Sequence, residues 1–243
     1  MTERLRLGML TPSSNTTLEP VTTAMLARLP EVSVHFARFK VTEITLTGTG
    51  LAQFDDSAIL AAATLLSHAK VHAIAWNGTS AGWLGFETDE QLCRRITAAT
   101  GIPSGTSMLA LNEVLSATGV RRLGLVTPYT TAVQDRIVAN YAHLGIECVA
   151  DPGLGIEDNY AFAEVPEETL AAMVRSVATR RPDAIAILCT NLRSAHLAEA
   201  LEQESGIPVY DTIATAVWKS LRLAGADSGR VTGWGRLFRS AMP

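Results

Sequence analysis

Two hydrophobic patterns alternate along this chain. Short apolar runs, typical of strands and in their unbroken form of buried parallel strands, occur at residues 4–10, 32–40, 71–76, 121–126, 147–150 and 184–189. Between them apolar residues recur every three or four positions, which predicts helices over 18–29, 57–69, 88–100, 107–117, 131–143, 167–179, 194–204 and 212–223. Alternating strands and helices indicate an α/β fold with parallel sheets and right-handed crossovers.

The pattern occurs twice. Three segments have a later counterpart in the same order, namely 6–13 with 122–129, 73–80 with 184–191, and 101–104 with 206–209. Such strands and Gly-Ile-Pro turns also recur in unrelated α/β proteins, which is the alternative to a true repeat. We predict two pseudo-symmetric βα-repeat halves, each a parallel sheet flanked by helices, over 1–119 and 120–224. Residues 225–243 form a tail that we expect to pack back on the first half.

Four turns follow the predicted central strands. They lie at 11–17, 77–80, 127–131 and 189–192, and they are rich in hydroxyl side chains and short of charge. Ligands of open α/β sheets bind outside the carboxyl ends of the strands. If the two halves face each other, these turns meet in one cleft, where we expect the active site. The long segment 41–53 is a candidate flap over it.

Cys189 is the candidate reactive residue of this cleft. It follows a buried run, and the matching position in the first half is Gly78. A thiol there can move one proton to or from carbon. The alternative is that Cys189 is only a small buried hydrophobe, which is the favoured interpretation for Cys93 and Cys148.

The turns also supply hydrogen-bond donors. Together with backbone N–H groups at helix starts they suit a carboxylate, or the enediolate of a carboxylic acid that has lost an α-substituent or α-proton. The side chains concerned are Asn15, Thr79, Ser80, Tyr129 and Thr190. Trp76 and Trp83 flank the Gly78-Thr79-Ser80 turn, where they either wall the pocket or pack in the core.

Composition excludes several classes of function. Charged residues make up 18% of the chain, and the net charge of −4 without a basic run argues against nucleic acid as a partner. No apolar run approaches the ~18 residues of a membrane span. Three widely spaced cysteines indicate reduced thiols in the cytoplasm. A nucleotide motif and a metal-ligand spacing are both absent, so we expect no cofactor and no metal.

These residues resemble the aspartate/glutamate racemase superfamily, within it the branch of arylmalonate decarboxylase and maleate cis-trans isomerase. Racemases of the superfamily use one cysteine from each half. Gly78-Thr79-Ser80, Tyr129 and Cys189 look instead like the decarboxylase, which has a glycine at the first position and one cysteine at the second. The resemblance implies that the Thr, Ser and Tyr side chains, with backbone amides, form a dioxyanion hole, and that the cysteine protonates the enediolate.

The first turn departs from the decarboxylase pattern. It is similar to maleate isomerases, in which the asparagine matching Asn15 contacts a substrate carboxylate. This implies a small or polar dicarboxylate, in a pocket with contributions from Pro12, Ser13, Trp76 and Asn77.

Decarboxylation of a small α-substituted malonate, without a cofactor, is therefore the expected activity. It needs no base, because the departing CO2 leaves its electron pair behind. Two-base racemisation needs a group that Gly78 cannot supply. A maleate isomerase or racemase-type isomerase and an inactive small-acid binding protein are the alternatives, and a homo-oligomer is compatible with the sequence.

Overall fold

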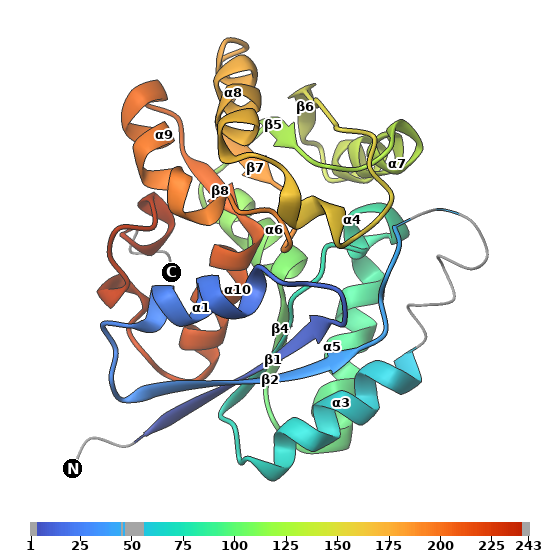
Figure 1. Ribbon diagram of the computed structural model, residues 1–243, viewed down its shortest axis with the longest axis vertical. Helices are drawn as coiled ribbons and strands as arrows, with labels where there is room; N and C mark the ends of the chain where they lie inside the picture. Colours follow the sequence, from blue (N-terminus) through green and yellow to red (C-terminus); the bar gives the residue numbers. More distant parts are fainter. Residues whose placement is uncertain (1–3, 45, 47–55, 240–243) are drawn as a thin grey trace.

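The computed structural model, which describes residues 4–44, 46 and 56–239, contains two four-stranded sheets, one from each half of the sequence (Figure 1). Every strand pair is parallel, and the strand orders, β2-β1-β3-β4 and β6-β5-β7-β8, are the same order repeated. The predicted α/β fold of two repeats is confirmed. The strands are β1 Leu5–Pro12, β2 Val32–Phe39, β3 Ala73–Trp76, β4 Ser104–Thr106, β5 Arg122–Val126, β6 Glu147–Ala150, β7 Ala184–Ile187 and β8 Val209–Asp211.

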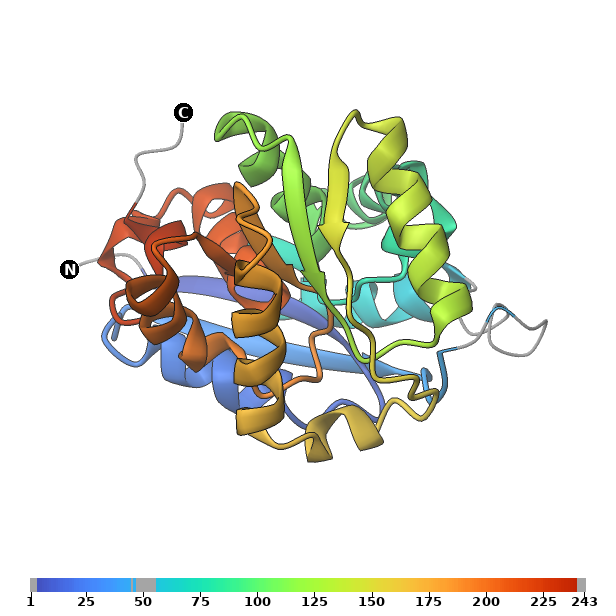
Figure 2. The same ribbon diagram turned by 90° about the horizontal axis from the view of Figure 1, so that it is seen from above.

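Helices cover both sheets and fill the space between them (Figures 1 and 2). Helices α3 and α5 pack on the first sheet, and α7, α8 and α9 pack on the second. Helix α10, although last in the sequence, packs against α6 and against β3 and β4 of the first sheet. The α-helices are α1 Leu18–Leu26, α3 Asp56–His68, α4 Ala81–Leu84, α5 Phe86–Thr100, α6 Ser107–Ala117, α7 Thr131–His143, α8 Glu167–Ala178, α9 Ala198–Ser205 and α10 Thr212–Leu223.

Two short elements were not predicted from the sequence. Helix α4 begins directly after Ser80, and the 3-10 turn η1 (Ala161–Glu164) lies in the connection from β6 to α8. The helix predicted from residue 194 begins as another 3-10 turn, η2 (Ala195–Leu197), before α9. Such segments span too few residues to show a helical period.

The N-terminus of α1 is capped by the side chain of Asn15 rather than by that of its N-cap residue. Thr17 is the N-cap residue, but its side chain makes no capping hydrogen bond. The Asn15 Oδ1 atom accepts from the N–H groups of Thr17 and Leu18, at 3.0 and 2.8 Å. The Thr17 hydroxyl donates instead to the carbonyl of Asn191. Asn15 therefore provides the local cap, and the Thr17 hydroxyl makes a contact with the other half of the molecule.

The C-terminal tail touches both halves. Arg28 on the first half donates to the Thr232 hydroxyl, at 3.0 Å. The Arg236 N–H donates to Glu202 of α9 in the second half, at 2.7 Å. The short turns of the tail are η3 (Ser228–Arg230) and η4 (Arg236–Phe238). The division at residue 119 stays a prediction. Within the described ranges, no helix combines the length and apolar character of a membrane span.

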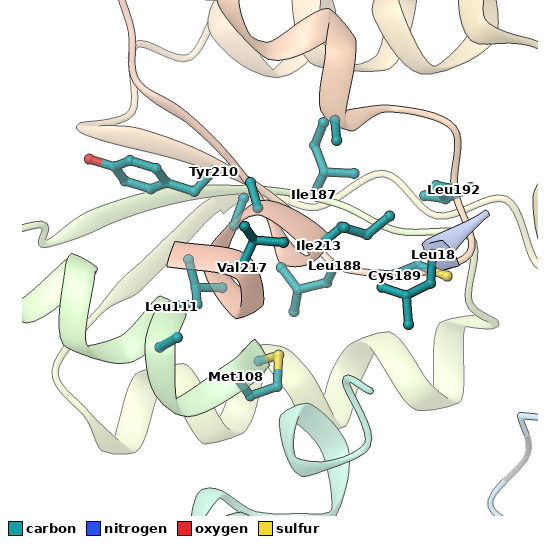
Figure 3. Packing of buried hydrophobic residues seen from close by; sticks show 14 of the residues in the cluster. Leu18, Met108, Leu111, Ile187, Leu188, Cys189, Leu192, Tyr210, Ile213 and Val217 are labelled. Carbon is teal, nitrogen blue, oxygen red and sulfur yellow. The ribbon is translucent and has the colours of Figure 1, made fainter. Parts of the chain in front are cut away.

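One continuous apolar core joins the sheets and helices. Its members come from both halves and are almost fully buried, and they include Met108, Leu111, Ile187, Leu188, Ile213 and Val217. Cys189 lies at one end of this packed group, beside Leu188 and Leu18 (Figure 3). The carboxyl end of β7 thus delivers a thiol from the core to the junction between the halves.

Candidate active site

A small cavity lies where the ends of β1, β3, β5 and β7 meet. Its volume is about 20 Å³, room for little more than one water molecule. Among the residues that the structure describes, none that lines it carries a charge. The lining residues are Pro12, Val41, Ile44, Trp76, Gly78, Thr79, Ser80, Trp83, Tyr129, Asn159, Cys189 and Thr190. Neutral hydrogen-bond donors, rather than cations, are what this cavity offers to an anion.

Cys189 contributes a protonated thiol to the cavity. Its side chain is 2% exposed, and burial raises the pKa of the thiol to about 12. Hydrogen bonds from the Asn191 backbone and the Tyr129 hydroxyl act in the opposite direction but do not offset burial. The thiol is therefore neutral near pH 7, which suits a proton donor better than a nucleophile.

Tyr129 connects the thiol to the first half. Its hydroxyl lies 2.6 Å from Thr79 Oγ1 and also interacts with the Cys189 side chain. Burial raises the pKa of Tyr129 well above its usual value, so the phenol stays protonated. Trp83 and Phe162 pack on its ring, with centroids 5.2 and 5.6 Å away. The Tyr129 hydroxyl is thus held in place between the Gly-Thr-Ser turn and the thiol.

Backbone and hydroxyl donors remain unused at the cavity wall. Within the described parts of the chain, no acceptor takes the backbone N–H groups of Thr79, Ser80 or Thr190, nor the hydroxyl of Ser80. All three residues line the cavity and are 4–5% exposed. Buried donors without partners are costly unless a ligand or water satisfies them. The oxygens of a carboxylate or enediolate are acceptors that would suit these donors.

Asn15 lies beside the cavity and does not line it. Its amide group donates to the carbonyl and hydroxyl oxygens of Thr190, at 2.9 and 3.2 Å, while its oxygen caps α1. The Thr190 hydroxyl donates to the Asn77 carbonyl, at 2.9 Å. A substrate carboxylate would have to replace Thr190 as the partner of the Asn15 amide, so carboxylate binding by Asn15 stays a prediction.

Two further pocket candidates support the site from outside. The Asn77 amide donates to the carbonyls of Leu10 and Ala75, which fixes the end of β3. The Ser13 hydroxyl accepts from the Val41 N–H, at 3.2 Å, and so holds the segment that lines the cavity. Pro12, Trp76 and Gly78 lie in the wall of the cavity.

Three lining residues were missed because they come from the long loops. Val41 and Ile44 belong to the segment predicted as a flap, of which residues 45 and 47–53 lie outside the described residues. Ile44 and Asn159 join the two loops, through Ile44 N–H to the Glu157 carbonyl and Asn159 N–H to the Thr42 carbonyl. The length and polar composition of these loops were the only indication in the sequence that they contribute to the site.

The other candidate side chains lie elsewhere. His196 pairs with Glu167 at the surface, 3.1 Å apart, and is not among the residues that line the cavity. Cys93 and Cys148 are free thiols outside the cavity, and burial raises their pKa to about 11 and about 12. No group of three His, Cys, Asp or Glu side chains placed for a metal ion occurs in the part of the chain that the structure describes.

Comparison with known proteins agrees with this geometry. The family model for arylmalonate decarboxylase matches residues 7–238. Arylmalonate decarboxylase from Bordetella bronchiseptica is 33% identical over 142 residues, which cover 58% of this chain and 59% of that protein. Maleate isomerase from Nocardia farcinica is 29% identical over 96% of this chain and 95% of that protein.

A solved structure extends the likeness to three dimensions. The Nocardia farcinica maleate isomerase, as a cysteine-to-serine mutant with a covalently bound succinylcysteine intermediate, superposes with a TM-score of 0.86. It is 27% identical, and the match covers 97% of this chain and 98% of that one. The match of the family model over nearly the whole chain, together with the paired sheets and the single thiol, shows that this protein belongs to the arylmalonate decarboxylase family.

Proposed function

We propose that this protein is a cofactor-independent decarboxylase of a small α-substituted malonate, with Cys189 as its proton donor. The observation that carries the proposal is the asymmetry of the cavity: one protonated thiol on one half and a glycine at the matching position of the other. A single acid is what protonation of an enediolate needs. Racemisation by a two-base mechanism needs two acid–base groups.

The reaction begins with loss of CO2. The bond from the α-carbon to one carboxylate breaks, and its electron pair moves into the other carboxylate, which becomes an enediolate. The apolar walls formed by Val41, Ile44 and Trp83 favour this step, because a charged carboxylate in a dry site gains by leaving as neutral CO2. The donors of Thr79, Ser80 and Thr190 and the hydroxyl of Tyr129 are placed to stabilise the enediolate.

Protonation completes the reaction. The Cys189 thiol gives its proton to the α-carbon, which restores the carboxylate of the product, and the thiolate then takes a proton from solvent. The neutral thiol at pH 7 supports this direction of transfer. Since the donor lies on one wall of the cavity, the proton should reach one face of the α-carbon, and a deuteron in its place should give one enantiomer.

Maleate isomerase is the second candidate function. Four curated maleate isomerases match more than nine-tenths of this chain, and one of them has been solved with a succinylcysteine intermediate. Here Cys189 is the cysteine available for such an addition. A thiol whose pKa is raised by burial is a poor nucleophile until it is deprotonated, which favours the decarboxylase.

A substrate panel in heavy water tests these functions. Methylmalonate, phenylmalonate and maleate are supplied to the purified protein, and CO2 release and deuterium at the α-carbon are measured. A decarboxylase releases CO2 and yields one enantiomer with one deuterium. Fumarate formation without CO2 would establish the isomerase instead. Stabilisation against heat without turnover would indicate a binding protein for small acids.

The same proposal extends to the cellular location of the protein and to its partner. We propose a cytoplasmic enzyme whose partner is a small dicarboxylic acid, in keeping with its three free thiols. A homo-oligomer stays a prediction.

A further inference from the structure

The space in front of Gly78 is already filled. A Cβ atom added to Gly78 would lie 2.6 Å from Cη2 of Trp76, and closer still to Cζ2 and Cε2. Carbon atoms in contact normally lie about 3.5–4.0 Å apart. The six-membered ring of the indole therefore occupies the volume that any side chain at position 78 would need.

Trp76 has little freedom to move away. It is the last residue of β3, is 1% exposed, and packs on Phe39 with ring centroids 5.0 Å apart. Its neighbours Leu10 and Thr106 on the adjacent strands fix its backbone. A rotation of the indole would break this packing and leave a void in the core.

The second half shows what the same position looks like without this obstacle. There β7 ends at Ile187, two residues before Cys189, just as β3 ends at Trp76, two residues before Gly78. An isoleucine therefore stands two residues before the thiol, and a tryptophan, the largest side chain, stands two residues before the glycine. In each half a large residue at one of these positions goes with a small residue at the other.

We infer that Trp76 is a specificity-determining residue whose indole closes the side of the cavity contributed by the first half, so that both the second acid–base position and bulky α-substituents are excluded. Trp76 and Cys189 line the same cavity of about 20 Å³. A substrate whose α-carbon meets the Cys189 thiol would then have an inert aromatic ring, and no second proton donor, on the side of Gly78. The statement about substituents rests on the proposed decarboxylase function, whereas the statement about position 78 does not.

Stability measurements test the packing without any substrate. The set consists of Gly78→Ala, Trp76→Ile and the double variant, with Gly82→Ala as the control because a Cβ at Gly82 would meet its neighbours at ordinary distances of 3.5 Å or more. We expect Gly78→Ala to lower Tm by on the order of 5 °C or more in the native background. In the Trp76→Ile background the same change should shift Tm by about 2 °C or less. An equal loss in both backgrounds would overturn the inference.

Trp76→Phe provides a second background. It retains an aromatic contact with Phe39 but lacks the indole atoms that lie over Gly78, so it keeps the cycle measurable if Trp76→Ile fails to fold. Gly78→Ala should again lower Tm less in the Trp76→Phe background than in the native one, and equal losses of Tm would contradict the inference.

Activity measurements test the consequence for chemistry. In heavy water, Gly78→Cys alone should add no second deuterium at the α-carbon of the product, while Trp76→Ile/Gly78→Cys should also replace the remaining α-hydrogen by deuterium. Trp76→Ile should raise kcat/KM for phenylmalonate relative to methylmalonate by about 10-fold or more. A second deuterium in the product of Gly78→Cys alone, or an unchanged substrate ratio, would refute the role of Trp76. If the native protein releases CO2 from neither malonate, the decarboxylase proposal fails while the Tm result still decides whether Trp76 blocks position 78.

Discussion

The two halves of the molecule share their strand order and differ at the ends of their central strands. In the first half β3 leads to Gly78, Thr79 and Ser80, which offer hydrogen-bond donors and no acid. In the second half β7 leads to Cys189, which offers the thiol, and then to Thr190. Repetition of the fold thus provides a cavity with two matching walls, and under the proposed function only the wall from the second half carries a proton donor.

A second difference concerns the contact between the halves. Asn191 occupies the position that matches Ser80, and its side chain joins three segments. Its oxygen accepts from the N–H groups of Thr16 and Thr17, at 3.0 and 3.2 Å, and its amide donates to the Asn159 carbonyl, at 2.6 Å. The second half therefore holds the first loop of the other half, whereas Ser80 leaves its hydroxyl for the cavity.

A third difference is an exchange of roles between a carboxyl group and a hydroxyl group. In the first half Thr106 caps α6 and hydrogen bonds to the buried Asp89. In the second half Asp211 caps α10 and accepts from the Ser194 hydroxyl, at 2.6 Å. Each half thus buries one carboxyl beside one hydroxyl, with the two partners interchanged. Burial raises the pKa of Asp89 to about 7 and that of Asp211 to about 6.

Removal of the Cys189 thiol should have the largest effect, because neither wall of the cavity then carries a proton donor. Cys189→Ala should lower the rate of product formation by about 10²–10⁴-fold, the usual contribution of a positioned acid. The assay is release of CO2 from the best malonate of the panel. Cys148→Ala removes a thiol outside the cavity and should keep full activity. Full activity in Cys189→Ala would rule out Cys189 as the donor.

Loss of the Tyr129 hydroxyl should have the next largest effect, since it bridges the two walls. Tyr129→Phe should lower kcat by about 10²-fold, as does loss of one donor from an oxyanion hole. Tyr141→Phe is the matched control, because the buried Tyr141 hydroxyl has no hydrogen-bond partner in the described chain. The proposal for Tyr129 would not survive equal kcat values in the two variants.

Conversion of Asn191 to its counterpart from the first half tests the contact between the halves. Asn191→Ser removes two acceptor bonds and one donor bond at a buried position, and should lower the free energy of unfolding by about 2 kcal/mol in urea titrations. Asn140→Ser removes a single bond between the halves, to the Gly82 carbonyl, and should cost about half as much. Equal costs would argue against the multiple role of Asn191.

The last prediction concerns the buried carboxyl of Asp89 and an effect of at most about 1.4 kcal/mol between pH 6 and 7. The pKa of this carboxyl is raised on folding from the unfolded value near 4, so the folded protein keeps a proton that the unfolded chain releases. Stability should therefore fall as pH rises from about 4 to about 7, by at most about 1.4 kcal/mol per pH unit for this group. Asp89→Asn should flatten the profile between pH 6 and 7, above the range of Asp211. The free energy of unfolding is measured by urea titration at each pH. If its dependence on pH is the same in Asp89→Asn, the raised pKa of Asp89 is contradicted.

Much of the architecture was predictable because its signals are local. The helices α6, α7 and α10 begin and end at the predicted residues, since period and capping residues depend on neighbours in the chain. The repeat predicted the paired sheets, and the apolar run before Cys189 predicted a strand that ends at the site. Helix α4 and the lining from the loops were missed because they have no period of their own.

The sequence by itself determined the doubled α/β fold, the four turns at its centre and the presence of one thiol opposite a glycine. These follow from residue type and spacing, which act over a few positions along the chain. Only the tertiary structure decided which donors are free and which volumes are filled. The Asn15 amide is engaged by Thr190, a residue from the other half, and the Trp76 ring covers Gly78. Both outcomes depend on side-chain orientations and on distances that arise only when the halves and strand ends pack together, so no local pattern encodes them.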